Sequence, residues 1–122
     1  MSTLIQNMID GERVEARIAT FPHAPESWTP RTARTAAHAE GLALTDEHWQ
    51  VVRALQEYFA RHEERERNMR ELHDALDEYF HASGGMRYLY TLFPKGPVAQ
   101  GCRIAGLHAS DIAADRGFGS VM

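Results

Sequence analysis

This chain has very little cysteine, no long apolar run and no excess of positive charge. Among its 122 residues the sole cysteine is Cys102, so no internal disulfide can form and any chemistry of this thiol is intermolecular. No stretch approaches the roughly 20 apolar residues of a membrane helix, and the N-terminus lacks the basic region and apolar run of a signal peptide. With 13 Lys+Arg against 17 Asp+Glu, the net charge of −4 argues against broad attraction to nucleic acid or an anionic membrane. We therefore expect a cytoplasmic protein with no membrane partner.

The signatures of common catalytic and metal sites are missing too. The sequence has no Gly-rich phosphate loop, no Gly-x-Ser-x-Gly elbow, no His-x-x-x-His pair and no cysteine cluster. His62 with Glu66, and His73 with Asp77, have the i, i+4 spacing that places two ligand types on one helix face. Such pairs are more often ordinary solvated helix contacts. The sequence thus predicts no metal, no cofactor and no independent enzymatic turnover.

The length suits one domain with a single core of modest size. Asp10-Gly11 lies between short mixed runs, which predicts a β-hairpin over residues 5–18. A proline-rich connection follows, and we expect its Trp28 to pack onto the body of the domain. The alanine-rich run from Arg31 to Glu40 predicts a helix, which Gly41 closes with a left-handed cap.

Two apolar series at helical spacing come next, separated by a charged segment over residues 62–67. Thr45 is a suitable N-cap for the first series, with His48 three residues on, where a glutamate is usual. The charged segment is either a polar helical turn or the bend between two helices. The first series comprises Trp49, Val52, Leu55, Tyr58 and Phe59, and the second Met69, Leu72, Leu76, Tyr79 and Phe80. We expect these two faces to meet in the core.

The C-terminal part predicts two shorter helices. The first runs from about Tyr88 and stops before Pro94. Pro97 suits the first turn of the next helix, which reaches about Ala105 and is capped by Gly106.

Two segments resemble the DsrC/TusE family of sulfur-relay proteins. One is Tyr88-Leu89-Tyr90-Thr91-Leu92-Phe93-Pro94-Lys95-Gly96-Pro97, continued by Gln100-Gly101-Cys102-Arg103-Ile104-Ala105-Gly106-Leu107, and the other is Leu44-Thr45-Asp46-Glu47-His48-Trp49. The resemblance implies a mainly α (α+β) fold, an orthogonal helical bundle with a small N-terminal hairpin, a helical body over residues 31–106 and a mobile C-terminal arm over 107–122. It also implies persulfide transfer with protein partners, either sulfur-relay proteins such as a TusBCD-like complex serving tRNA thiolation or a dissimilatory sulfite reductase-like complex.

The sulfur site implied by this resemblance is Cys102, which corresponds to the upstream of the family's two cysteines. Carriers in the family have a penultimate cysteine, whereas this chain ends Gly117-Phe118-Gly119-Ser120-Val121-Met122. A carrier needs an exposed thiolate with a lowered pKa, and Lys95 and Arg103 are candidates for the supporting positive charge. His108 stands where the family usually has a proline and is a further candidate for local support or partner binding.

Three readings of Cys102 and the chain remain open from the sequence. Cys102 accepts or passes persulfide sulfur, or it is an ordinary buried cysteine in a paralogue that binds the same partners without carrying sulfur. The third reading is a regulatory protein of sulfur metabolism.

DNA binding is the alternative from another class of function. Two helices across the charged segment could form a helix-turn-helix, whose available base readers are Arg67, Asn68 and Arg70. The same helix carries Glu71, Asp74, Asp77 and Glu78, which would repel phosphates. The sequence therefore favours protein partners over nucleic acid.

Overall fold

The computed structural model describes residues 21–112, and this part of the chain is mainly helical and contains no strand. The hairpin predicted over residues 5–18 and the arm beyond residue 112 lie outside the described residues. The elements are α2 (Pro30–Ala39), α3 (Asp46–Arg61), the 3₁₀ turn η1 (Glu64–Glu66), α4 (Met69–Tyr79), the 3₁₀ turn η2 (His81–Ser83), α5 (Gly85–Leu92), α6 (Ala99–Ala105) and the 3₁₀ turn η3 (Ala109–Asp111).

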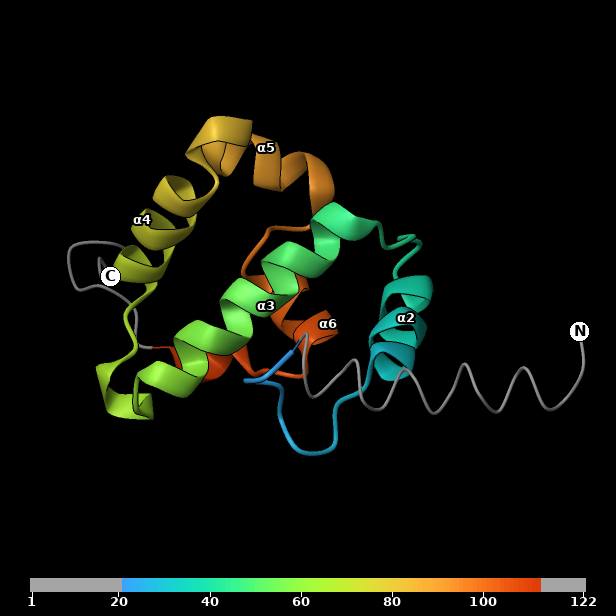
Figure 1. The fold of residues 1–122 in the computed structure, drawn as a ribbon, viewed down its shortest axis with the longest axis horizontal. Helices are drawn as coiled ribbons and strands as arrows, with labels where there is room; N and C mark the ends of the chain where they lie inside the picture. The colour runs from blue at the N-terminus through green and yellow to red at the C-terminus, as the bar shows by residue number, and fades with distance from the viewer. Residues whose placement is uncertain (1–20, 113–122) are drawn as a thin grey trace, which may run out of the picture.

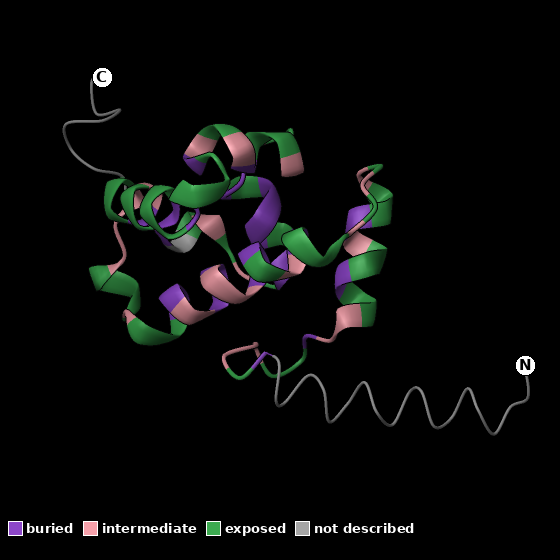
Figure 2. Cartoon of the chain, turned by 45° about the horizontal axis from the view of Figure 1, so that its top comes forward, coloured by how far each residue is buried: buried purple, intermediate pink, exposed green. Residues whose placement is uncertain are grey.

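Helix α3, the longest of the described helices, runs diagonally through the domain, and α6 packs against both α3 and α2 (Figure 1). Helices α4 and α5 pack against each other, and α4 lies at the opposite side of the domain from α2. Buried residues recur along the inner sides of α3 and α2 (Figure 2), as their apolar periodicity predicts.

Helix α2 begins with a threonine capping box. The Thr32 N–H donates to Thr29 Oγ1 at 3.2 Å, and the Thr29 N–H donates to Thr32 Oγ1 at 3.0 Å. Pro30 occupies the first turn, where a missing N–H costs nothing. The helix therefore starts one residue before the predicted Arg31, and Gly41 closes it with a φ of 74°, as predicted.

His48 occupies the capping-box position at the start of α3 where a glutamate is usual. Its Nδ1 accepts the Thr45 N–H at 3.0 Å, so the other ring nitrogen, Nε2, must carry the proton and donates to the Leu92 carbonyl at 2.8 Å. The side chain is buried and lies edge-on to Phe93. The capping role is confirmed, and the same ring packs in the core and joins the start of α3 to the end of α5.

The crossing of α3 and α6 forms the centre of the core. Leu55 of α3 is fully buried, and a Cβ added at Gly101 of α6 would stand 2.7 Å from Leu55 Cδ1. Only glycine permits this approach without a shift of the neighbouring side chain. Gln56 adds a buried polar link at the same crossing, because its Nε2 donates to the Ala105 carbonyl at 3.0 Å.

The predicted core face of α4 is correct except at Tyr79. Leu72, Leu76 and Phe80 are buried, whereas Tyr79 is 70% exposed. Phe80 lies four residues after Leu76 and takes the inward position, while the Tyr79 ring lies against the Phe80 ring at 4.8 Å between centroids. The helix ends at Tyr79, and the 3₁₀ turn η2 connects it to α5.

The charged segment 62–67 is the bend between two helices, with η1 as its single turn. Arg67 folds back across this bend: its Nε donates to the His62 carbonyl and its Nη2 to the Phe59 carbonyl, both at 3.0 Å. These two bonds satisfy carbonyls at the end of α3 that have no partner within the helix.

The two C-terminal helices are present as predicted, but their starts differ: α5 begins at Gly85, before the predicted Tyr88. Helix α6 begins at Ala99, two residues after Pro97, although its hydrogen-bond ladder already opens with Gln100 N–H donating to the Gly96 carbonyl at 2.9 Å, followed by Gly101 N–H donating to the Pro97 carbonyl at 3.1 Å. Gly106 caps it with a φ of 79°. Trp28 packs over this cap and donates its Nε1–H to the Ile104 carbonyl at 2.8 Å, so the predicted packing of Trp28 is confirmed. Among the described helices, none is both long and apolar enough to cross a membrane.

Candidate site around Cys102

The Cys102 thiol lies in the core on the inner side of α6. Its residue is only 1% exposed, and burial raises the pKa of the thiol from its ordinary 9.0 to about 12, against a smaller lowering by the positive charge of Arg103. The thiol is therefore protonated and shielded in this conformation. Neither requirement for a persulfide acceptor, exposure or a lowered pKa, is met here.

The Arg103 guanidinium is bonded to Glu40, at the end of α2. Arg103 Nε donates to Glu40 Oε2 at 2.7 Å, and Nη2 donates to Oε1 at 2.8 Å. This two-point geometry is the strong form of an arginine–carboxylate pair. It joins α2 to α6 across 63 residues of sequence.

Lys95 and Gln100 complete the same network. Gln100 is buried; its Nε2 donates to Glu40 Oε1 at 3.1 Å, and its Oε1 accepts the Lys95 N–H at 3.0 Å. The Lys95 Nζ lies 4.0 Å from Glu40 Oε1. We call Glu40, Lys95, Gln100 and Arg103 the Glu40 network; it fastens the end of α2, the α5–α6 connection and α6 to one another.

The electrostatics of the Glu40 network centre on the carboxylate. The hydrogen bond from Arg103 is the main cause that lowers the pKa of Glu40 from 4.5 to about 2, burial opposes the shift, and the charge of Arg103 adds to it. The pKa of Arg103 is raised, first by its hydrogen bond to Glu40. Both cationic residues that the sequence assigns to the sulfur site are thus gathered at Glu40 rather than at the thiol.

The structure places the remaining candidate, His108, on the surface at the start of η3. It takes no part in the Glu40 network. Glu40 and Gln100 are the residues that sequence reasoning missed. Glu40 appears in the sequence as no more than the end of a helix, and no local signal points to an arginine 63 residues away.

The structure gives no support to a metal centre or to base reading by α4. Within residues 21–112, no group of three or more His, Cys, Asp or Glu side chains is placed to hold a metal ion. Of the three candidate base readers, Arg67 is bound to carbonyls of α3, and Asn68 caps α4 by accepting the Glu71 N–H at 2.9 Å. Both residues already serve the fold at the bend.

Replacing Glu40 by glutamine should destabilise the protein by about 1–3 kcal/mol at neutral pH, because the charge-assisted bonds to Arg103 become neutral ones. The folded pKa of about 2 lies below the ordinary 4.5, so the stabilisation is fully present above pH 4.5 and is lost as pH falls through about 2. Urea unfolding of the wild-type protein and Glu40→Gln, measured from neutral pH downward, should therefore show the difference in their free energies of unfolding shrinking in acid. Glu78→Gln, at an exposed carboxylate on α4, is the matched control; equal losses in both variants would contradict the prediction.

Comparison with known proteins places residues 8–111 in the family described as DsrC like protein. The chain is 31% identical to the sulfurtransferase TusE of Escherichia coli O6:H1 over 100 residues, which cover 82% of this chain and 92% of the relative. It is 30% identical to the sulfurtransferase TusE of Photorhabdus laumondii over 104 residues, 85% of this chain and 94% of the relative. To that of Pectobacterium atrosepticum it is 37% identical over 81 residues, 66% of this chain and 74% of the relative. No solved structure matches the chain.

Proposed function

This chain belongs to the DsrC/TusE family, and we propose that it serves a sulfur relay by binding relay proteins, with Cys102 as a packing residue rather than the sulfur carrier. The burial of Cys102 is the observation that carries the second half of this proposal. The curated relatives are named sulfurtransferases, which supports the first half.

Persulfide transfer makes a specific demand on the acceptor. Its thiolate must attack the outer sulfur of a donor persulfide, so that a new S–S bond forms while the donor leaves as a thiolate. A sulfur buried in the core on α6 is shielded from a partner's persulfide. To expose Cys102, α6 would have to leave Leu55, break the Gln56–Ala105 hydrogen bond and lose the Trp28–Ile104 hydrogen bond.

The carrier reading is the second candidate. It rests on Cys102 being the sole thiol of the chain and matching a cysteine position of the family. In this reading a partner draws α6 away from α3, and the thiol then ionises and takes up sulfur. Lys95 and Arg103 would have to leave Glu40 before they could support a thiolate.

A direct test is titration of the purified relay complex, or the sulfite reductase, of the source cell with wild-type protein and Cys102→Ala. We expect equal affinities, because the thiol lies in the core and not on the docking surface. Mass spectrometry of wild-type protein from the complex, after exposure to a persulfide donor, should show no reductant-labile sulfur on Cys102.

Two outcomes would count against this proposal. Persulfide on Cys102 in the complex, with sulfur transfer lost in Cys102→Ala, would establish the carrier. Failure of the wild-type protein to bind either candidate complex would remove the relay role.

A variant lacking Arg116 to Met122 also tests where docking occurs: retained binding is expected if the helical body carries the contact surface.

A further inference from the structure

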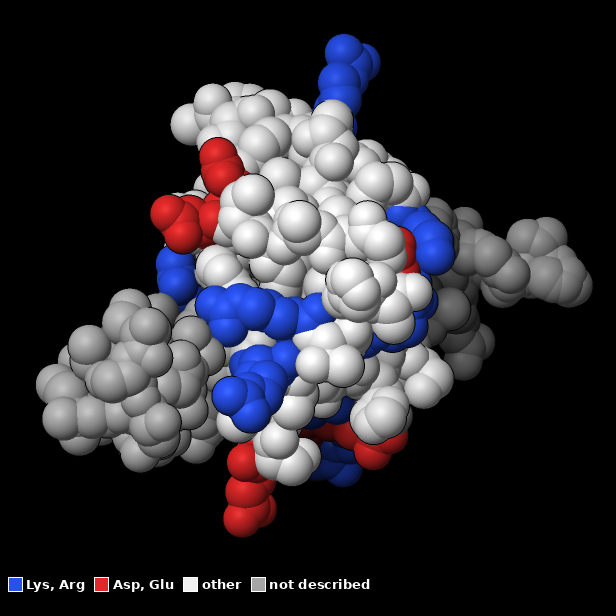
Figure 3. Space-filling view, turned by 90° about the vertical axis from the view of Figure 1, so that its right-hand side faces the viewer, with Lys and Arg blue, Asp and Glu red and all other residues white. Residues whose placement is uncertain are grey.

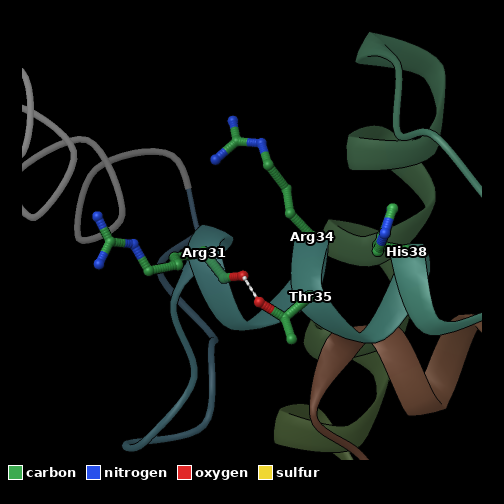
Figure 4. Close-up of a pocket in the computed structure, with 4 residues that line it drawn as sticks. All are labelled: Arg31, Arg34, Thr35 and His38. Carbon is green, nitrogen blue, oxygen red and sulfur yellow. Dashed lines mark hydrogen bonds between the residues drawn. The ribbon is translucent and has the colours of Figure 1, made fainter.

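One helix face on this acidic chain is basic. Arg31, Arg34 and His38 recur at helical spacing along the exposed side of α2, and with Thr35 they line an open hollow of about 560 Å³. Figure 4 shows both arginine side chains extending outward from the first turns of the helix, while Thr35 Oγ1 donates to the Arg31 carbonyl at 3.1 Å. We call Arg31, Arg34, Thr35 and His38 the α2 basic face.

The charge of this face is segregated from the rest of the chain. The ten residues of α2 contain no aspartate or glutamate, although the whole chain carries a net charge of −4. The opposite side of the helix, Ala33 and Ala37, is buried in the core. Lys and Arg side chains gather across the middle of the surface seen in Figure 3, with acidic side chains toward its margins. A partner approaching α2 therefore meets positive charge.

Aromatic rings lie against Arg34 of this face and against Arg53 of α3. The Arg34 guanidinium lies over the Trp49 ring at 5.3 Å, Trp49 lies against Phe21 at 5.6 Å, and the Arg53 guanidinium lies over Phe21 at 5.5 Å. The stacking restricts the arginine side chains before any partner arrives, which lowers the entropy lost on binding. A guanidinium held in this way presents a planar pair of donors that matches a carboxylate.

We propose that the α2 basic face is a docking surface for the acidic surface of a partner protein. The inference deepens the proposed function and rests on it, since the partner is the relay protein bound there. The face carries two arginines and one histidine, fewer cationic groups than the roughly 6–10 phosphate contacts of a duplex-binding protein. A membrane-binding helix needs an exposed apolar face, whereas the apolar side of α2 is buried. Both comparisons favour a cluster of carboxylates on a protein.

The test is titration of the purified relay complex with wild-type protein, Arg34→Glu and His38→Glu. Arg34→Gln serves as a milder second variant, and thermal unfolding checks that each variant folds. Arg65→Glu is the matched control, because it makes the same charge reversal on an 85% exposed side chain in η1, at the other end of α3. We expect Arg34→Glu to weaken binding by about tenfold or more, Arg34→Gln to weaken it less, and the control to leave it unchanged. Raising the salt concentration should weaken wild-type binding.

The outcomes separate this inference from the function on which it rests. Relay binding that survives Arg34→Glu and His38→Glu overturns the docking surface and leaves the relay role standing. Absence of wild-type binding overturns both. Duplex DNA that binds through Arg34 more tightly than the relay complex would assign the face to nucleic acid instead. Residues 1–20 contain Asp10, Glu12 and Glu15. If the relay complex binds only the variant that lacks residues 1–20, the chain's own N-terminus is the occupant of the α2 basic face and the proposal fails.

Discussion

Leu76→Ala should lower the free energy of unfolding by about 2–5 kcal/mol, the cost of a leucine side chain removed from a packed core. Leu76 is 2% exposed and belongs to the inward row of α4 with Leu72 and Phe80. Leu76 belongs to the core cluster of buried residues, so its removal leaves a cavity within packed side chains. Chemical denaturation of the purified variant, with the midpoint and slope both fitted, measures the loss.

Tyr79→Ala is the matched control for this prediction. It removes a larger side chain from the same helix, but from a position that is 70% exposed, so its effect should be much smaller than that of Leu76→Ala. If both variants unfold like the parent, α4 contributes little to the core. If Tyr79→Ala is the more damaging one, the inward face of α4 has been assigned incorrectly.

The sequence predicts well those features that depend on neighbours along the chain. The helix start at Thr45 with His48, the cap at Gly106 and the inward positions of α4 all follow from spacing within a few residues. Tyr79 is the informative failure, because a residue at i+3 and one at i+4 fit the same apolar stripe and only packing decides which turns inward. No periodicity could settle that choice.

The arrangement at the site depends on contacts that the sequence does not encode locally. Lys95 and Arg103 lie near one another, but their common partner is Glu40 and not Cys102. The pairing joins the end of α2 to α6, and only the way these helices pack brings the carboxylate within reach. The burial of Cys102 likewise depends on tertiary packing, because α6 packs against both α3 and α2.

Cys102 and the α2 basic face lie on two different helices. The thiol faces inward from α6, while the exposed charge lies on α2, and the Glu40 network holds these two helices together. A partner that docks on α2 therefore contacts a helix that is bonded to α6, the helix that carries Cys102. Because the thiol and the proposed docking face lie on different helices, the reactivity of Cys102 can be measured in the absence of a partner.

Alkylation of Cys102 by iodoacetamide should be at least about 1000-fold slower in the native protein than in urea. The folded pKa of about 12 exceeds the ordinary 9.0, and at neutral pH that difference alone reduces the thiolate fraction by about three powers of ten. Burial of the sulfur slows the reaction further, because the reagent reaches it only when α6 opens. Mass spectrometry of timed, quenched samples gives both rates.

The matched control is the double variant Cys102→Ala with Ser83→Cys, which moves the sole thiol of the chain to an exposed position in η2. Its native and unfolded rates should agree within about tenfold, since an exposed thiol keeps an ordinary pKa. Native Cys102 reacting as fast as this surface thiol would show that α6 opens readily at rest. The barrier to persulfide chemistry would then vanish, and the carrier reading would replace the packing role proposed for Cys102.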